Sequence, residues 1–442
     1  MKTGNLSFVL VCLLVFAGAS PAADDPALLI ENVTLIDGTG RPPLPGAYVL
    51  VEGERVVAVS PDPLSVPAGT ARIDGEGLYL IPGLIDSHIH LPGGRTGRGN
   101  REMIMDIQTG VRLLHGYLYS GVTSVYDSGN HGAFIERMRA DERAGNILSP
   151  RIFATINLLA PREGHGCCAG GIVVETLEDG MQAIDSLLQY QPDLLKFTRE
   201  SRGMGAAPRN MPLMSTQLLG QLIAYANERG LRTTVHVSEA ALAREAVLAG
   251  ASALAHTVYL NEIDSGFANL LASRGVALST TIIRIEADVS FYDAPLFKAL
   301  MTAEELAEEK ANPRYVGPEI AAWRRSLQPI IFRNIRRLHA AGVTLAMGTD
   351  RSIGAAPHEE LRLLVEAGIS ALDALRMATL NAAIYIGVQD QLGSIEPGKL
   401  ADMLLLRADP TADIRNTQAI EAVFKGGRRI ARSELIAVGN AH

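Results

Sequence analysis

Hydrophobic residues occur in eight short runs through the middle of the chain, and each run is followed by a helix-like or irregular stretch. A run of about four to eight apolar residues between turn residues is typical of a strand buried on both faces. The runs are Leu84–Leu91, Thr123–Asp127, Arg151–Ile156, Leu194–Thr198, Thr233–Val237, Ala253–Thr257, Ala277–Thr281 and Thr344–Asp350. Helical periodicity is clear in Thr216–Arg229, Glu239–Ala249 and His358–Ala367. Gly230 and Gly250 follow the first two and are placed to end helices.

Strands that alternate with helices favour an α/β fold, a closed (β/α)8 TIM barrel, whose chemistry takes place at the carboxyl ends of the strands. An open, doubly wound parallel sheet is the alternative, but no glycine-rich dinucleotide loop follows an early strand. The stretches Asn157–Gly171, Arg199–Pro212 and Arg284–Trp323 follow the third, fourth and seventh strands. We expect them to ring the mouth of the barrel, where they could include a lid.

Both ends of the chain carry short runs rich in Val, Ile and Leu, separated by Gly- and Pro-containing turns, as antiparallel strands should be. These runs are Ala27–Ile36, Tyr48–Ser60 and Ala71–Leu80 before the barrel, and Ala401–Leu406 and Ala419–Ile430 after it. We expect the two ends to pair as one small β-sandwich domain. The expected boundaries are 23–82 and 391–442 for the two parts of the sandwich and 83–390 for the barrel.

Residues 1–22 have the pattern of a secretory signal peptide: Lys2 near the start, an apolar run from Phe8 to Ala17, and small residues ending in Ala22. The apolar run is shorter than the roughly 20 residues that a helix needs to span a bilayer. We therefore expect cleavage near Ala22, a periplasmic or secreted mature protein, and no stable insertion in the membrane.

Composition narrows the choice of partners. Of 442 residues, 47% are hydrophobic and 20% are charged, which predicts a globular protein with a large core. Acidic residues outnumber basic ones 48 to 40, for a net charge of −8, and no Lys/Arg run suggests nucleic-acid binding. We expect a small-molecule substrate and leave a homo-oligomer open. Cys167 and Cys168, the two cysteines after the signal, are adjacent and so cannot provide a disulfide framework.

Six residues of metal-ligating type lie at or near the ends of the expected barrel strands. His88 and His90 close the first strand, and the period of two along a strand places both imidazoles on the same side. The others are Lys196 in the fourth strand, His236 in the fifth, His256 in the sixth and Asp350 at the end of the eighth. Imidazole and carboxylate ligands suit zinc or a neighbouring divalent metal.

Lys196 is one of only six lysines in the chain, and it interrupts an apolar strand. Burying an ammonium group without a partner costs several kcal/mol, so such a lysine loses its proton or acquires a countercharge. One interpretation is a salt bridge to Asp193 or Glu200. The other is that the neutral amine reacts with carbon dioxide to form a carbamate, whose two oxygens could bridge two metal ions.

Several motifs surround these residues: Leu80–His90 (LIPGLIDSHIH), Gly121–Val125 (GVTSV), Asp193–Lys196 (DLLK), Gly348–Asp350 (GTD) and Gly393–Asp402 (GSIEPGKLAD). As a set they resemble the metal-dependent amidohydrolase superfamily, over nearly all of the mature chain. The resemblance is greatest to the branch that contains imidazolonepropionase-like enzymes and zinc-dependent prolidases, or Xaa-amino-acid dipeptidases.

The resemblance implies two divalent metal ions, with zinc as the first choice. His88, His90 and Asp350 would hold one ion, His236 and His256 would hold the other, and N6-carboxylated Lys196 would bridge them. A hydroxide between the ions would be the nucleophile, because two Lewis acids lower the pKa of bound water. Asp350 would take its proton and pass it to the departing nitrogen.

Residues near these ligands are candidates for contact with substrate. His165 lies in a Gly-His-Gly stretch. The resemblance implies that this stretch stabilises the oxyanion or contacts substrate. The alternative interpretation is that His165 is an exposed loop histidine. Arg199 and Arg202 could bind a carboxylate or simply be solvated. Tyr126 stands where dipeptidase-like relatives tend to have arginine, which puts a free α-carboxylate on the substrate in doubt. His358 either belongs to the site or caps a helix.

The sequence therefore predicts an exported binuclear amidohydrolase that cleaves an amide-type C–N bond of a dipeptide, an N-acyl amino acid or a related amide. A phosphotriester or lactone hydrolase could use the same two-metal centre. A mononuclear deaminase would not need the bridging lysine. A non-catalytic binding protein would typically have lost ligands, whereas all six positions are filled here.

Overall fold

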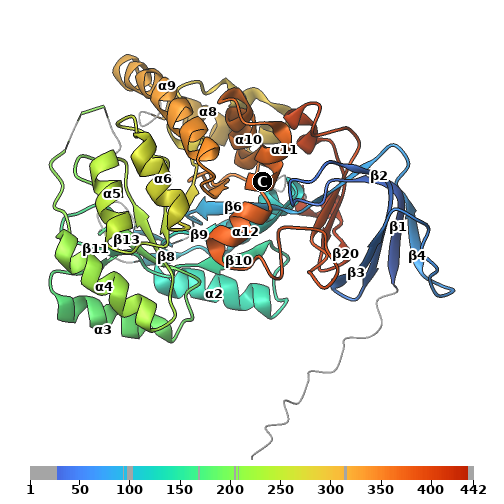
Figure 1. Cartoon of the computed structure of the whole chain (residues 1–442), viewed down its shortest axis with the longest axis horizontal. Coiled ribbons are helices and arrows are strands. Elements are labelled where there is room, and N and C mark those ends of the chain that lie inside the picture. The colour runs from blue at the N-terminus through green and yellow to red at the C-terminus, as the bar shows by residue number, and fades with distance from the viewer. Residues whose placement is uncertain are drawn as a thin grey trace, which may run out of the picture.

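The computed structural model describes residues 27–92, 94–96, 103–167, 170–203, 206–207, 209–312 and 316–436. The expected signal peptide lies outside these residues, as does Cys168, so both expectations stay predictions. None of the described helices is long and apolar enough to cross a membrane. Figure 1 shows a barrel surrounded by helices and, at one side, a separate group of strands drawn from both the N-terminal and the C-terminal parts of the chain.

Eight parallel strands form the wall of the barrel, and each corresponds to one of the eight expected runs. They are β6 (Leu84–Ile89), β9 (Val122–Asp127), β10 (Arg151–Ala154), β13 (Leu195–Thr198), β14 (Thr233–His236), β15 (Ala253–Leu254), β16 (Ala277–Ser279) and β17 (Leu345–Ala346). The ladder runs β10-β9-β6 in one sheet and β13 to β17 in order in the other. The expected (β/α)8 barrel is confirmed.

Two backbone hydrogen bonds join these sheets and close the barrel. The amide of Ser87 donates to the carbonyl of Met347, 3.0 Å away, between β6 and β17. The amide of Asp193, just before β13, donates to the carbonyl of Ala154 in β10, also at 3.0 Å. Closure brings the carboxyl ends of strands that are far apart in sequence to a single rim.

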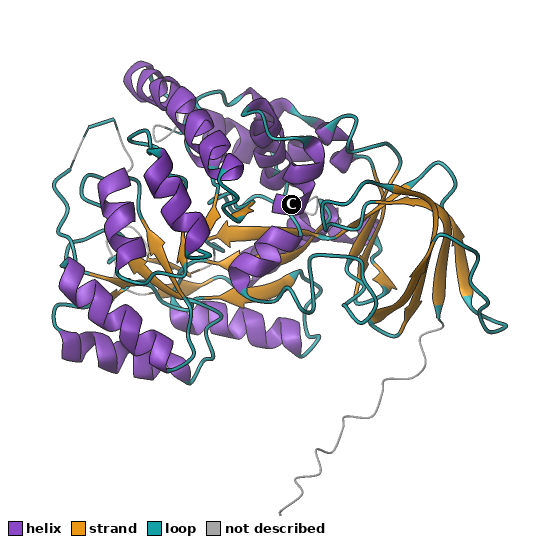
Figure 2. Cartoon of the chain, viewed as in Figure 1, coloured by secondary structure: helices purple, strands orange, loops and turns teal. Residues whose placement is uncertain are grey.

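Helices cover the outside of the barrel, as the secondary-structure colours of Figure 2 show. The three helices expected from periodicity are α4 (Thr216–Glu228), α5 (Ala240–Leu248) and α10 (Ala356–Glu366). Gly230 and Gly250 have φ angles of +74° and +100°, the left-handed conformation that ends a helix. The other helices around the barrel are α1 (Ile107–Tyr119), α2 (Gly132–Arg143), α3 (Leu177–Leu188), α6 (Ser265–Ser273), α9 (Pro318–Ala340), α11 (Ala371–Met377) and α12 (Leu380–Ile386).

The segment between β16 and α9 contains only short helices. They are η1 (Ile282–Arg284), η2 (Ser290–Asp293), α7 (Pro295–Leu300) and α8 (Ala303–Ala311). Tyr292 and Phe297 form a small apolar cluster of their own with Ala355, next to the end of β17. The expected mouth segment therefore packs beside the carboxyl end of the barrel.

The strands from the two chain ends form one domain, as expected. They are β1 (Leu28–Leu35), β2 (Leu44–Glu52), β3 (Arg55–Ser60), β4 (Ala71–Asp74), β5 (Tyr79–Pro82), β18 (Met403–Leu406), β19 (Ile420–Lys425) and β20 (Arg428–Arg429). The order is β20-β19-β18-β5-β1-β2-β3, with β4 paired to β1. The antiparallel pairing of β5 with β18, which sets Leu80 opposite Leu405, joins the two ends. Val33, Met403 and Phe424 are fully buried in the core of this β-sandwich.

Two expected strands of this domain are hairpins. Tyr48–Ser60 is split at Gly53, with a φ of +55°, and Ala419–Ile430 is split at Gly426 and Gly427. The apolar pattern continues on both sides of each turn, so hydrophobicity alone did not reveal the breaks.

Candidate metal centre

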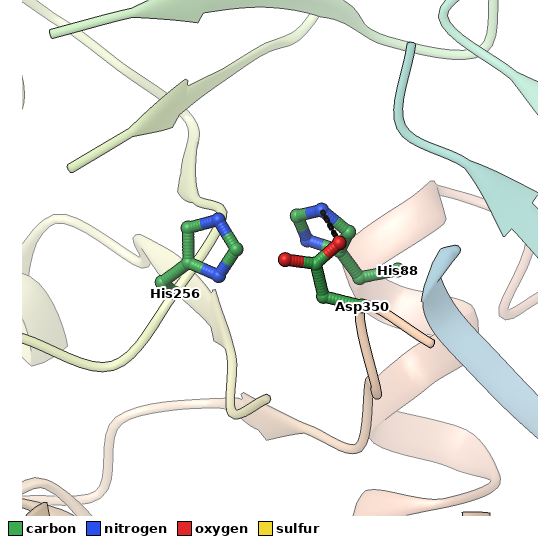
Figure 3. A group of neighbouring side chains, drawn as sticks. All are labelled: His88, His256 and Asp350. Carbon is green, nitrogen blue, oxygen red and sulfur yellow. Dashed lines mark ion pairs between the residues drawn. The ribbon is translucent and has the colours of Figure 1, made fainter. Parts of the chain in front are cut away.

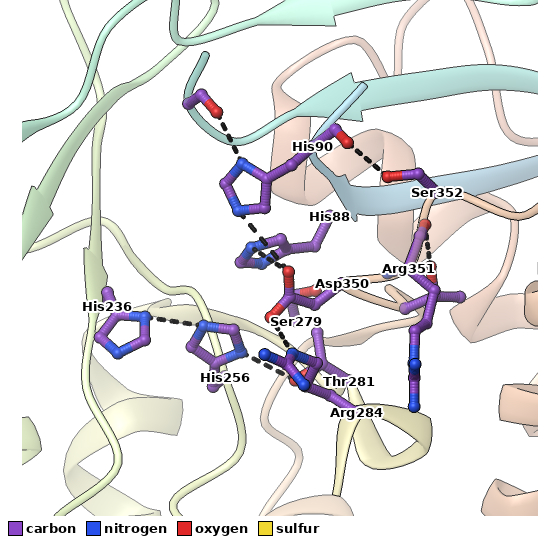
Figure 4. Close-up of polar contacts among 12 residues, drawn as sticks. His88, His90, His236, His256, Ser279, Thr281, Arg284, Asp350, Arg351 and Ser352 are labelled. Atoms are coloured by element: carbon purple, nitrogen blue, oxygen red, sulfur yellow. Dashed lines mark hydrogen bonds and ion pairs between the residues drawn. The ribbon is translucent and has the colours of Figure 1, made fainter. Parts of the chain in front are cut away.

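The six predicted metal ligands come together at the carboxyl ends of five barrel strands. Since parallel strands end at the same rim, side chains distant in sequence can share one centre. His88 lies in β6 and His90 follows it, Lys196 lies in β13, His236 ends β14, His256 follows β15, and Asp350 follows β17. Figure 4 shows the four imidazoles and the carboxylate of Asp350 facing one another.

One half of the centre is formed by His88, His90 and Asp350. The Nε2 atom of His90 is 3.6 Å from Oδ1 of Asp350, and the Nε2 atom of His88 is 4.0 Å from the same oxygen. Lys196 Nζ lies 3.3 Å from His88 Nε2. Three nitrogens and one oxygen from three strands therefore point into the same space.

The other half is formed by His236 and His256. The Nδ1 atom of His236 and the Nε2 atom of His256 are 2.8 Å apart. The remaining ring nitrogen of His256, Nδ1, is 2.9 Å from the hydroxyl of Thr281. One ligand atom each from His88, His256 and Asp350 lies within 4.8 Å of the others, so the two halves are continuous (Figure 3).

The chemistry of these side chains fits divalent cations. Burial lowers the pKa of His88, His90 and His256, and the neighbouring Lys196 lowers all three further. Neutral imidazoles keep a lone pair for a metal, and nitrogen with carboxylate oxygen is a zinc-type ligand set. Asp350 opposes this shift in the pKa of His88 and His90, but burial is the larger effect.

Lys196 is buried, and the structure excludes both of its expected salt-bridge partners. Asp193 lies 3.5 Å from Arg139 and accepts the amide of Ala154, while Glu200 faces His236. Burial lowers the pKa of Lys196 to about 8, although the negative charge of Asp350 acts in the other direction and favours the protonated amine. At this pKa about a tenth of the amine is neutral at pH 7, far more than for an ordinary lysine, and the neutral form is the one that reacts with carbon dioxide.

Asp350 is held in place by contacts that sequence analysis did not identify. Its backbone φ is +49°, and its amide donates to the carbonyl of His88 at 2.7 Å. Asp86 accepts both the amide of Thr349, at 3.0 Å, and the Thr349 hydroxyl, at 2.7 Å. Arg284 Nε donates to Oδ2 of Asp350 at 3.0 Å. The signal for Asp86 was a carboxylate inside an apolar strand, two residues before His88; nothing singled out Arg284.

The charge of Asp350 follows from these neighbours. Burial alone would raise the pKa of this carboxyl group, but neighbouring positive charge, chiefly that of Arg284, holds the pKa well below its usual range. Asp350 is therefore an anion with one oxygen, Oδ2, engaged by Arg284 and the other, Oδ1, directed at the histidines.

His90 has a fixed orientation. Its Nδ1 atom is 2.6 Å from the carbonyl of Gly129, which as an acceptor selects the Nδ1–H tautomer and leaves Nε2 free to bind a cation. Asp127 shapes this loop by accepting the amide of Leu91 and the side-chain amide of Asn130, each at 2.8 Å.

His165 lies at the edge of the centre, where it was expected. Its ring stacks on that of His236, with centroids 3.9 Å apart and planes 16° apart. The hydroxyl of Thr198, at the end of β13, donates to the His165 carbonyl at 2.8 Å and fixes the loop. An exposed loop histidine is excluded, and the catalytic role of His165 stays a prediction.

Two expected substrate contacts are contradicted by the structure. Arg199 is directed at α4 and α5, where it donates to the Met214 carbonyl, to the Thr216 hydroxyl at 2.9 Å and to Glu245. Tyr126 is fully buried and packs edge to face on Tyr385, with centroids 6.1 Å apart.

Tyr126 shares an apolar cluster with Ile85 and Leu194, which lie at the amino ends of β6 and β13. It therefore fills the barrel interior at the end opposite the metal ligands, where substrate has no access. The guanidinium of Arg202 lies 5.9 Å from the centroid of the Trp323 ring of α9, and its contact with substrate stays a prediction.

His358 does not belong to the centre, and its side chain does not cap the start of its own helix, α10. Its Nε2 atom is 2.9 Å from the carbonyl of Ser120, at the end of α1, and Nδ1 is 2.8 Å from the hydroxyl of Thr417. It joins α10 to α1 and to the short helix η3 (Ile414–Gln418).

Comparisons with known proteins agree with this architecture. The sequence model of the amidohydrolase family matches residues 79–430. Ochratoxinase of Aspergillus niger is 24% identical, over 89% of this chain and 84% of its own length. Imidazolonepropionase of Geobacillus kaustophilus is 25% identical, over 86% of this chain and 89% of its own. The crystal structure of a Xaa-Pro dipeptidase with methionine bound in its active site has a TM-score of 0.75 at 23% identity, over 91% of this chain and 99% of that one.

Proposed function

This chain belongs to the amidohydrolase family, and from that premise we propose that it is an exported enzyme that uses two divalent metal ions to hydrolyse an amide bond of a small molecule. The superfamily predicted from sequence, with its imidazolonepropionase and prolidase-like branch, is confirmed. The chain is accordingly a hydrolase that acts on carbon–nitrogen amide bonds. The substrate that we propose is a dipeptide, an N-acyl amino acid or a related amide.

The observation that carries the proposal is the convergence of four imidazoles, a carboxylate and a buried lysine at one rim. His88, His90 and Asp350 would hold one ion, and His236 and His256 would hold the second. Carboxylated Lys196 would bridge them, because its amine is buried, lacks either expected acidic partner and lies 3.3 Å from His88. When bound, two such cations would supply Lewis acidity that polarises a carbonyl group and acidifies water.

The side chains around this centre would handle the proton and orient the substrate. Asp350, an anion with Oδ1 directed at the histidines, would accept a proton there and deliver it to the departing nitrogen. Arg284 would keep Oδ2 from rotating into that position. His165, fixed on the His236 ring, would donate a hydrogen bond to the substrate carbonyl oxygen.

The bridging role of Lys196 predicts a loss of metal on substitution. The mature chain, reconstituted with Zn²⁺ and bicarbonate, should contain two ions by elemental analysis. Lys196→Ala should lose at least one of them, because the anionic bridge is removed, whereas Lys298→Ala, on exposed α7, should keep both. Two ions and full activity in Lys196→Ala would contradict the bridge.

Pairs of substrates with the same acyl group, one an amide and one an ester, would test the reaction. Faster turnover of dipeptides, N-acyl amino acids or cyclic amides than of matched aryl esters supports the amidase. Turnover of esters, lactones or phosphotriesters alone would favour the alternative hydrolase. Recovery of a mature chain that begins near Ala23 from the periplasm or medium would test export.

A further inference from the structure

Glu200, just after β13, has a fully buried side chain that contacts both a predicted metal ligand and a loop at the mouth of the barrel. Oε2 lies 3.5 Å from Nε2 of His236 and accepts the hydroxyl of Ser238 at 2.5 Å. Oε1 accepts the amides of Arg202 and Gly203, at 3.2 and 3.1 Å. The sequence suggests Glu200 only as a salt-bridge partner for Lys196, a role that the structure excludes.

The two nitrogens of His236 face different partners. A neutral imidazole carries one N–H, and which nitrogen carries it depends on the hydrogen bond that the other atom makes. A carboxylate only accepts, and Oε2 of Glu200 lies 3.5 Å from Nε2 of His236, so Glu200 favours a proton on Nε2 and a lone pair on Nδ1. The lone pair on Nδ1 then points at Nε2 of His256, 2.8 Å away.

His256 leaves a lone pair in the same place. Its Nδ1 atom can donate to the Thr281 hydroxyl at 2.9 Å, which leaves Nε2 unprotonated. Two lone pairs directed at each other repel in the absence of a cation and suit a cation that both can bind. The opposite tautomer of His236 would instead place a proton between the rings and block that position.

We propose that Glu200 is a positioning residue that holds His236 in its metal-binding tautomer and ties the Arg202 loop to the same ligand. The inference rests on the proposed function, since it assumes that His236 and His256 bind a metal ion. Second-sphere carboxylates on histidine ligands generally fix ring orientation, and their loss weakens metal binding by about 10- to 100-fold.

Glu200→Gln separates the two roles of this side chain. The glutamine oxygen can still accept the amides of Arg202 and Gly203, which forces the NH2 group toward His236 and Ser238. That group donates to Nε2 and so favours the Nδ1–H tautomer. The full mature chain should bind the second Zn²⁺ about 10- to 100-fold more weakly in a chromophoric-chelator competition, while the first ion binds as in the wild type.

The tautomer itself is measurable. Metal-free protein labelled with ¹⁵N-histidine gives two-bond ¹H–¹⁵N spectra in which the two tautomers have different patterns. The His236 signal is assigned by its absence in His236→Gln. In Glu200→Gln this signal should change from the Nε2–H to the Nδ1–H pattern. Glu239→Gln is the matched control, because Glu239 lies on the same rim and bonds Ser201 but none of the ligand candidates. It should leave affinity and tautomer unchanged.

Failure of the inference and failure of the proposed function look different. If His236→Ala binds two ions as tightly as the wild type, the two-metal centre itself is refuted. If His236→Ala loses one ion but Glu200→Gln binds within twofold of the wild type with the same tautomer, the role of Glu200 is overturned. If Glu200→Gln binds no metal at all, Glu200→Asp decides: a retained first ion and a weakened second support the proposal, and loss of both overturns it.

Discussion

Two residues at the metal centre have a left-handed backbone although neither is glycine: Thr281, with a φ of +52°, and Asp350, with a φ of +49°. Such conformations cost about 1–3 kcal/mol each and are rare for a β-branched residue. Thr281 is supported by Glu360, a buried carboxylate in α10 that accepts the amides of the next two residues at 2.8 and 2.7 Å. The strain at each residue aims a polar atom at a predicted ligand, because Thr281 contacts His256 and the Asp350 amide bonds His88.

Asp350→Asn tests the proton-transfer role at this scale. The amide keeps the shape of the side chain but cannot accept a proton at neutral pH, so turnover should fall at least about 100-fold while substrate still binds. Steady-state and single-turnover kinetics on an amide substrate measure this, at a fixed metal content. Asp390→Asn, at an exposed position, serves as control. Near-normal turnover by Asp350→Asn would exclude the role.

Residue type and strand position were enough to predict which side chains come together at the rim but not what orients them. His88 and His90 were recognisable because further potential ligands lie at the ends of other strands, which a histidine pair alone would not have shown. Arg199 was misassigned because the direction of its side chain depends on Glu245, which lies on α5. Asp86 and Thr281 act through hydrogen bonds between segments far apart in sequence, which no local pattern encodes.

At the scale of elements, α10 connects three parts of the fold through the buried side chain of His358. The ring spans Ser120, at the end of α1, and Thr417, in η3, which lies between β18 and β19. Burial lowers the pKa of His358 to about 4, while its hydrogen bond to Ser120 opposes the shift. The ring is therefore neutral in the folded protein at the pH values where a free histidine is protonated.

This shift predicts a contribution of His358 to acid sensitivity. Below an unfolded pKa of about 6.5, the unfolded chain binds a proton that the folded one excludes, so stability falls as the pH is lowered from about 6.5 to about 4. The loss attributable to His358 is at most about 3 kcal/mol. Melting temperatures across this range, on metal-free protein, should fall less steeply for His358→Gln, whose side-chain amide can still donate to Ser120. Equal slopes would contradict the assignment.

Strands and helices were predictable where the hydrophobic pattern kept the same period, and the same faces stayed buried, over the whole element and ended with it. The eight barrel strands satisfy this condition because both of their faces are covered. The hairpins at Gly53 and Gly426 do not, because their apolar pattern crosses the turn. The two-residue strands β11 (Leu159–Ala160) and β12 (Ile172–Val173), in the loop after β10, are set by tertiary pairing alone.

At the scale of the whole molecule, buried ion pairs join the barrel to the sandwich. Arg151, at the start of β10, donates to both carboxylate oxygens of Asp402, at 2.8 and 3.1 Å, and Asp402 also accepts the amide of Gly426 at 2.7 Å. Lys425 of the sandwich lies 2.7 Å from Glu142 of α2. Asp402 ends the GSIEPGKLAD motif, so part of the sequence signature of the superfamily encodes contact between domains rather than chemistry.

Asp402→Ala should destabilise the protein through this contact. It leaves the guanidinium of Arg151, which is 21% exposed, without its bidentate partner, at a cost on the order of 3 kcal/mol. We expect a melting temperature lower by roughly 5 °C, with part of the loss recovered in the double variant with Arg151→Met. Glu175→Ala removes an exposed pair with Arg162 and should change the melting temperature by less than about 1 °C. A similar effect of both alanine variants would argue against the interdomain role.

The position of β5 between β1 and β18 has a consequence for biogenesis. A ribosome makes β1 to β5 first and β18 more than 300 residues later, so the outer edge of β5 has no partner until the chain is nearly complete. An unpaired, apolar strand edge invites intermolecular pairing. A nascent chain of this kind therefore carries an aggregation-prone strand edge through the synthesis of the whole barrel.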